Sequence, residues 1–149
     1  MPFTPFHFGP GVLLKGLAPN KISFTAFMLA NVVVDLEPLY HILRADLPLH
    51  GPLHSFLAAT SAGAMVGAGV ALLPKAWQVV TKGRDLLAKR SRTLQAEFRP
   101  AASLLGGALG GFSHTVFDAF IYNDFHPLAP FSPVNPILGF ISADELISG

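Results

Sequence analysis

The sequence predicts an all-α integral membrane protein, a helical bundle with about three spanning helices plus a short N-terminal membrane helix. Composition is the first reason: 51% of the 149 residues are hydrophobic and only 13% are charged, about half the charged share usual in soluble domains. The mean hydropathy is +0.50. A soluble chain of this length would need more polar surface, whereas a bilayer removes that need. The length suits a single domain, residues 1–149.

Three long apolar stretches are the second reason, because a helix needs roughly 20 residues to cross a bilayer. They run from about Ile22 to Leu43, Leu53 to Leu73, and Ala101 to Tyr122. Small residues are frequent in the second and third. Glycine destabilises a soluble helix by about 1 kcal/mol per residue relative to alanine. In a membrane it lets helix backbones approach closely, so these stretches are expected to pack against each other.

The region between the second and third stretches, residues 75–100, is the one strongly polar part of the chain. It contains seven Lys and Arg residues, against only Asp85 and Glu97. Short loops rich in Lys and Arg stay in the cytoplasm, which predicts a basic cytoplasmic loop. Part of it, around Trp77 and Leu86, could instead be an interfacial helix on anionic lipid. Either explains the basic residues more simply than a nucleic-acid partner does.

The two ends of the chain carry weaker signals. The first residues, MPFTPFHFGPG, lack the early basic cluster of a signal peptide. Pro10 to Leu17 is expected to be a short helix that enters the membrane partway, although a helix lying on the membrane surface remains an alternative. A proline-rich loop follows Tyr122, and an apolar segment that begins at Ile137 reaches Gly149 before it could span.

Ionisable side chains inside apolar spans are costly and indicate function. Here they gather toward one end of each stretch: Asp35, Glu37, His50, His54, His114 and Asp118. With a cytoplasmic basic loop, all six lie toward the outer side of the membrane. Histidine and carboxylate ligands suit zinc, manganese or iron, and the chain has no cysteine to act as a sulfur ligand. We therefore predict a divalent metal site, with zinc the leading candidate.

Three other polar residues near these ends are ambiguous. His41 and Asp124 could belong to the site or lie in water at the membrane edge. His126, next to Pro127, is expected to be structural or exposed to solvent.

The same segments resemble a known family, the LexA-binding, inner-membrane-associated metal-dependent hydrolases (domain of unknown function 457), which are related to the phospholipase C and P1 nuclease superfamily. The resemblance covers nearly the whole chain and rests on MPFTPFHFGPG, NVVVDLEP, LHGPLHS and GGFSHTVFDAF. It implies a bacterial inner-membrane protein whose metal ligands are His7, Asp35, His50, His54, His114 and Asp118. Many members carry an Arg where Gly51 stands here.

Together the residues and the resemblance predict a membrane-bound metal-dependent hydrolase that cleaves a phosphoester or lipid-like substrate through metal-bound water. Glu37 is the candidate catalytic residue, as a general base or as the group that orients a ligand. One alternative is a non-catalytic membrane subunit, packed in a larger protein complex. Another is a haem subunit, which Asp35 and Asp118 disfavour because haem pockets lack adjacent carboxylates. Membrane lipids are the expected partners.

Overall fold

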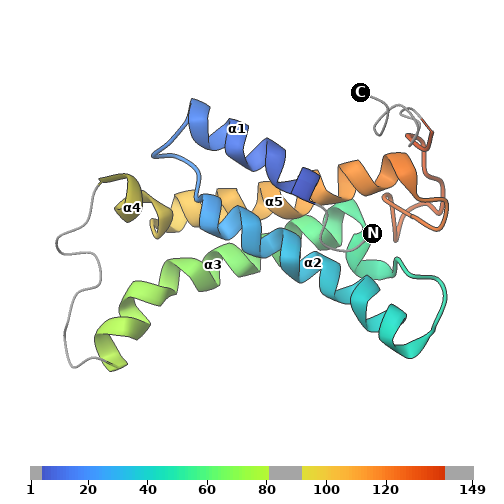
Figure 1. Cartoon of the computed structure of the whole chain (residues 1–149), viewed down its shortest axis with the longest axis horizontal. Helices are drawn as coiled ribbons and strands as arrows, with labels where there is room; N and C mark the ends of the chain where they lie inside the picture. Colours follow the sequence, from blue (N-terminus) through green and yellow to red (C-terminus); the bar gives the residue numbers. More distant parts are fainter. Residues whose placement is uncertain (1–4, 81–91, 140–149) are drawn as a thin grey trace.

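The computed structural model describes residues 5–80 and 92–139, and over these residues it is entirely helical, without a strand (Figure 1). The elements are η1 (Pro5–Phe8), α1 (Gly9–Leu17), α2 (Phe24–Arg44), η2 (Pro52–His54), α3 (Phe56–Val80), α4 (Arg92–Glu97) and α5 (Pro100–Ile121). Three helices are long and apolar enough to cross a membrane, over Phe24–Arg44, Phe56–Trp77 and Pro100–Ile121. The predicted all-α bundle with three such helices and a short N-terminal helix is confirmed.

Helix α2 begins and ends at clear local signals. Ser23 is its N-cap, and the Ser23 hydroxyl accepts a hydrogen bond from the Ala26 N–H at 3.1 Å. Ala45 ends the helix in the left-handed conformation (φ 54°). The face that α2 buries is made of small and apolar residues plus two polar ones: Ala26, Phe27, Ala30, Asn31, Val34, Asp35 and Pro38. Asn31 and Asp35 are therefore held inside the bundle, one helical turn apart.

Glycines allow α5 to pack closely on both other long helices. On the α3 side, a Cβ at Gly107 would lie 2.0 Å from the Gly63 carbonyl oxygen, and one at Gly111 would lie 2.0 Å from that of Ala59. On the α2 side, a Cβ at Gly106 would lie 2.2 Å from the Ser23 carbonyl oxygen. No larger residue fits at these contacts, so the expected role of the glycines in close helix packing is confirmed.

Helices α1 and α4 are attached to the end of the bundle where α2 begins. Gly11 of α1 faces the ring of Phe27, and Lys15 pairs with Glu97 of α4. Glu97 also accepts hydrogen bonds from the Ser23 hydroxyl (3.1 Å) and the Thr25 N–H (2.9 Å). Burial raises the pKa of Glu97, but the contact with Lys15 and these hydrogen bonds outweigh burial and hold the pKa below its ordinary value of 4.5. This ionised contact fixes where α1 lies.

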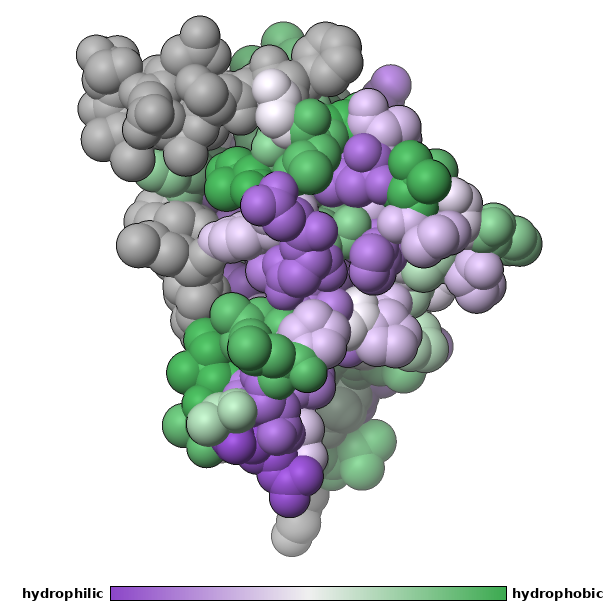
Figure 2. All heavy atoms as spheres, turned by 90° about the vertical axis from the view of Figure 1, so that its right-hand side faces the viewer, coloured by the Kyte–Doolittle hydropathy of each residue, from purple (hydrophilic) through white to green (hydrophobic). Residues whose placement is uncertain are grey.

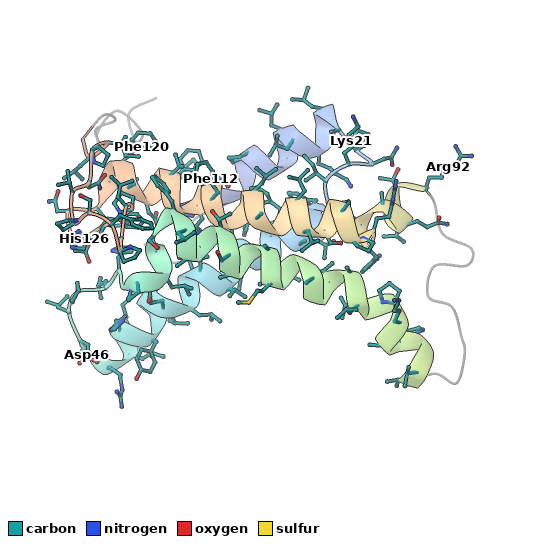
Figure 3. The ribbon with its side chains drawn as sticks, turned by 180° about the vertical axis from the view of Figure 1, so that it is seen from behind. Lys21, Asp46, Arg92, Phe112, Phe120 and His126 are labelled. Atoms are coloured by element: carbon teal, nitrogen blue, oxygen red, sulfur yellow. The ribbon has the colours of Figure 1, made fainter. Side chains whose placement is uncertain are left out.

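The outer faces of the long helices are apolar. Large hydrophobic side chains such as Leu43, Met65 and Leu57 are more than half exposed, as expected for helices that contact lipid. The polar residues lie toward the ends: Figure 3 shows Lys21 and Arg92 at one end of the bundle and Asp46 and His126 at the other.

The boundaries differ from the sequence-based ones around α3. The helix begins at Phe56, because residues 52–54 form the 3-10 turn η2, and it continues through Lys75 and Trp77 to Val80. The first part of the predicted basic loop is thus helical, and Arg92–Glu97 forms α4. Residues 81–91, with most of the basic side chains and Leu86, lie outside the described residues, as do residues 140–149 at the C-terminus.

Candidate metal centre

All six predicted metal ligands lie together near the end of the bundle opposite Lys21 and Arg92. Figure 2, which looks onto that end, shows hydrophilic side chains across its middle, bordered by hydrophobic ones. Every one of the six is less than 8% exposed: His7, Asp35, His50, His54, His114 and Asp118. Four segments contribute them, namely η1, α2, the connection from α2 to α3, and α5. The site is therefore a product of the tertiary fold.

The connection between α2 and α3 brings two histidines back over the bundle. The turn of η2 is closed by the His54 N–H donating to the Gly51 carbonyl (3.1 Å), and the Phe56 N–H donates to the Pro127 carbonyl (2.8 Å). Gly51 leaves room for the Glu37 carboxylate, since a Cβ there would lie 2.6 Å from Oε1 of Glu37 and this carboxylate would have to shift. This close approach lets Glu37 lie directly behind His54.

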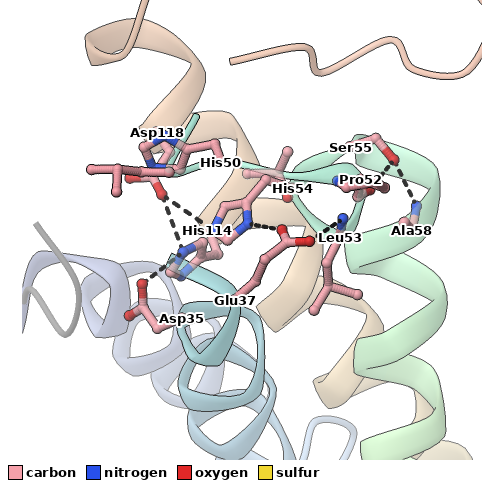
Figure 4. A network of polar contacts seen from close by, with 12 residues as sticks. Asp35, Glu37, His50, Pro52, Leu53, His54, Ser55, Ala58, His114 and Asp118 are labelled. Atoms are coloured by element: carbon pink, nitrogen blue, oxygen red, sulfur yellow. Dashed lines mark hydrogen bonds and ion pairs between the residues drawn. The ribbon is translucent and has the colours of Figure 1, made fainter. Parts of the chain in front are cut away.

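Three histidines are each held through the Nδ1 atom, and Figure 4 shows one of these contacts, between His54 and Glu37. Nδ1 of His54 lies 2.8 Å from Oε2 of Glu37, and Nδ1 of His50 lies 2.9 Å from Oδ1 of Asp124. Nδ1 of His114 lies 3.1 Å from Oδ1 of Asn31.

Since an ionised carboxylate only accepts, His50 and His54 must donate from Nδ1. The Asn31 amide donates to the Phe27 carbonyl at 2.8 Å, so its oxygen accepts from His114 in the same way. In each ring the lone pair is then on Nε2, the arrangement that metal-binding histidines adopt.

The Nε2 atoms of His54 and His114 converge on two aspartates. Nε2 of His114 lies 3.2 Å from Oδ2 of Asp118 and 3.5 Å from Oδ1 of Asp35. Nε2 of His54 lies 4.0 Å from the same Asp118 oxygen. Yet none of these contacts has hydrogen-bond geometry, so the buried Nε2 atoms of His54 and His114 have no hydrogen-bond partner among the described residues.

An orphaned buried nitrogen costs about 1–3 kcal/mol. Two ligand atoms bound to the same tetrahedral zinc at about 2 Å would be about 3.3 Å apart, close to the shorter of these separations. Divalent cations therefore fit the donors present and would satisfy these nitrogens.

Two groups of ligand atoms can be distinguished: His7 with Asp35 and His114, and His50 with His54 and Asp118. Within each group the ligand atoms all lie within 4.8 Å of one another. Asp118 lies between the groups, because its Oδ1 is 3.2 Å from Nε2 of His7 while its Oδ2 faces His114 and His54. The rings of His7 and His114 stack, with centroids 4.2 Å apart. The centre can thus hold a metal ion in either group.

Outside the spans, the electrostatics keep His50 neutral. Burial lowers the pKa of His50 by more than the contact with Asp124 raises it. For Asp124, burial raises the pKa, but the hydrogen bond from His50 outweighs it and the pKa is lowered. A neutral imidazole backed by an ionised carboxylate is the protonation state that a metal ligand needs.

The remaining polar residues take different places. Glu37 lies behind His54, and its second oxygen accepts the Leu53 N–H at 3.1 Å, so it orients the His54 ring, a candidate ligand. His126 bonds the Pro133 carbonyl at 2.7 Å and is exposed, in line with the structural or solvent-exposed place expected of it. His41 lies beside Tyr40 and belongs to neither group.

Sequence reasoning missed Asn31 altogether and left Asp124 open. Asp124 binds His50 and also accepts the N–H groups of Leu49 (3.1 Å) and His50 (3.3 Å). The one available signal for Asn31 was its position, four residues before Asp35 on the same helix face.

Comparison with known proteins finds no matching family model, no matching curated protein and no matching solved structure. The chemistry of the site therefore has to be argued from its own geometry.

Proposed function

We propose that this protein is a membrane-bound metal-dependent hydrolase that cleaves a phosphoester in a lipid or another membrane-associated substrate. The observation that carries the proposal is the shared orientation of His50, His54 and His114. Each is held at Nδ1 by a side-chain acceptor; the Nε2 atoms of His54 and His114 face Asp118, and His50 belongs to the same ligand group as His54 and Asp118. Packing alone does not call for three such matched arrangements in one place.

The charge in the centre supports binding of two divalent ions. Four carboxylates belong to it, from Asp35, Glu37, Asp118 and Asp124, and each forms an ion pair with a histidine. Protonating His54 and His114 at Nε2 would also supply positive charge, but neither Nε2 makes a contact of hydrogen-bond geometry with the aspartates. Two divalent cations supply four positive charges and use those nitrogens as ligands, with Asp118 shared between them.

Zinc is the proposed metal, since imidazole and carboxylate are its usual ligands in the absence of thiolates. A bound divalent cation would lower the pKa of a coordinated water to about 7 and neutralise charge on the scissile phosphate. The net reaction consumes one water: its oxygen forms a bond to phosphorus, the ester P–O bond breaks, and the leaving alcohol oxygen takes the proton. Glu37 and Asp124 position their histidines. The resemblance to the inner-membrane hydrolases points to the same chemistry.

Metal analysis of the protein tests the proposal. After gentle, chelator-free purification we expect close to two equivalents of zinc per chain in the wild type. Asp118→Asn, which weakens the shared ligand, and His114→Ala should each lose most of it. His126→Ala is the matched control, because His126 is an exposed histidine outside the centre, and it should keep the full content.

Two results would count against the function. If the wild-type protein neither carries nor takes up a divalent metal, metal-dependent hydrolysis is ruled out and a non-catalytic membrane subunit is favoured. Metal-loaded protein that hydrolyses neither soluble nor lipid phosphate esters would leave a metal site without this activity.

A further inference from the structure

One small cavity reaches the metal centre from the surface of the described residues. Its volume is about 30 Å³, room for roughly one or two water molecules. Asp35, His50 and Asp118 form its polar side. The rest of its lining is mostly apolar: Pro38, Ile42, Leu49 and Tyr122. The cavity thus connects candidate metal ligands directly with a mainly hydrophobic rim.

The rim lies in the groove between α2 and α5. Toward the end of the bundle with Lys21, α1 and η1 cover this groove. They contact both helices, and His7 of η1 reaches Asp118. The cavity lies in the part of the groove beyond His7, toward the opposite end of the bundle. It is bounded by α2 after Asp35, by the loop with Leu49, and by Tyr122, which follows α5. The opening is therefore at the side of the bundle, near the end that contains the metal centre.

The depth of the rim matches the boundary between acyl chains and head groups. Helix α2 has 21 residues, so it is about 31 Å long, close to the thickness of a bilayer's hydrocarbon core. Ile42 lies two residues before its end, and Tyr122 directly follows α5. Phosphate groups of membrane lipids lie just beyond this level.

Resting on the proposed hydrolase function, we propose that the substrate is a lipid phosphate ester that enters from the bilayer between α2 and α5. Its phosphate oxygens would reach, through the cavity, the cation that Asp118 and His50 would hold, while its chain stays outside on Ile42 and Leu49. The small volume supports this, because the cavity admits the reacting oxygens but not a large polar group. An apolar rim favours a substrate with a chain next to its phosphate over a water-soluble one.

Phosphate binding to the cobalt-loaded protein tests the route without relying on turnover. Cobalt(II) replaces zinc and gives a visible spectrum that changes when phosphate binds. The full chain in detergent is titrated with dodecyl phosphate, expressed as mole fraction in the micelle, and with methyl phosphate. We expect Ile42→Gln and Leu49→Gln each to weaken dodecyl phosphate binding about five- to tenfold. Cobalt content and methyl phosphate binding should stay within twofold of wild type.

Leu43→Gln is the control, because Leu43 neighbours Ile42 but is 78% exposed and does not line the cavity. It should bind both ligands as the wild type does. The route is wrong if both rim variants bind dodecyl phosphate as tightly as Leu43→Gln does, or if they lose methyl phosphate equally. Retained cobalt with methyl phosphate binding in those cases would leave the hydrolase proposal standing. Failure to bind cobalt or any phosphate would overturn both.

Discussion

The group behind each imidazole decides how strong a ligand that imidazole is. Carboxylates back His50 and His54, whereas the neutral amide of Asn31 backs His114. A negative acceptor stabilises positive charge on the ring and so raises the basicity of Nε2 more than an amide does. The group with His50 and His54 is therefore expected to bind its ion more tightly than the group with His114.

Asp124→Asn tests this idea at a single residue. The substitution removes the negative charge behind His50 and replaces one carboxylate oxygen with an NH2, which cannot accept either from the Leu49 and His50 N–H groups or from Nδ1 of His50. We expect zinc affinity to fall about 10- to 100-fold, measured by competition with a chelator. Asp46→Asn, an exposed change in the loop after α2, should have no effect. Equal affinities in the two variants would mean that Asp124 does not position His50.

At the scale of elements, α5 is the helix on which the site depends. It carries His114 and Asp118, and its glycines meet α3 on one side and α2 on the other. The separation of these backbones sets how near Asp35 and His54 come to the α5 ligands. The close packing of the α5 glycines against α2 and α3 therefore helps to set the distances between the candidate metal ligands.

Gly107→Leu should destabilise the bundle by about 3 kcal/mol or more, because its side chain would meet the Gly63 backbone, which cannot move without separating α3 from α5. Gly69→Leu is the matched control, since a Cβ at Gly69 has no atom within 4 Å. Thermal unfolding in detergent, followed by circular dichroism, gives the comparison. Similar midpoints for the two variants would show that the α3–α5 contact is looser than described.

At the scale of the whole molecule, the sequence predicted best the polar residues that lie within apolar spans. Asp35, His114 and Asp118 stand out because few polar residues occur in apolar spans. Successive spans cross the membrane in opposite directions, which places these three residues and His54 toward the same side. Side-chain partners were harder to foresee. The pairing of His114 with Asn31 depends on ring orientation, and the Lys15–Glu97 contact joins residues 82 positions apart. Neither contact corresponds to a spacing or motif that could be recognised in the sequence.

The distribution of basic residues predicts the orientation of the whole bundle. Two of the ten Lys and Arg residues precede α2 and seven lie between Lys75 and Arg99, which leaves only Arg44. By the positive-inside rule, the end with Lys21 and Arg92 should be cytoplasmic and the metal centre should lie toward the opposite face. A phosphate released there would leave on the non-cytoplasmic side.

Cysteine labelling tests this orientation directly, because the chain contains no cysteine of its own. Leu47→Cys introduces a thiol at a position that is 84% exposed after α2, and Arg92→Cys introduces one at the exposed start of α4. A membrane-impermeant maleimide added to bacterial cells with a permeable outer layer and an intact inner membrane should label Leu47→Cys alone. Arg92→Cys should react only after the inner membrane is opened. The reverse pattern would place the metal centre toward the cytoplasm, where the lipid phosphate would have to come from the inner leaflet.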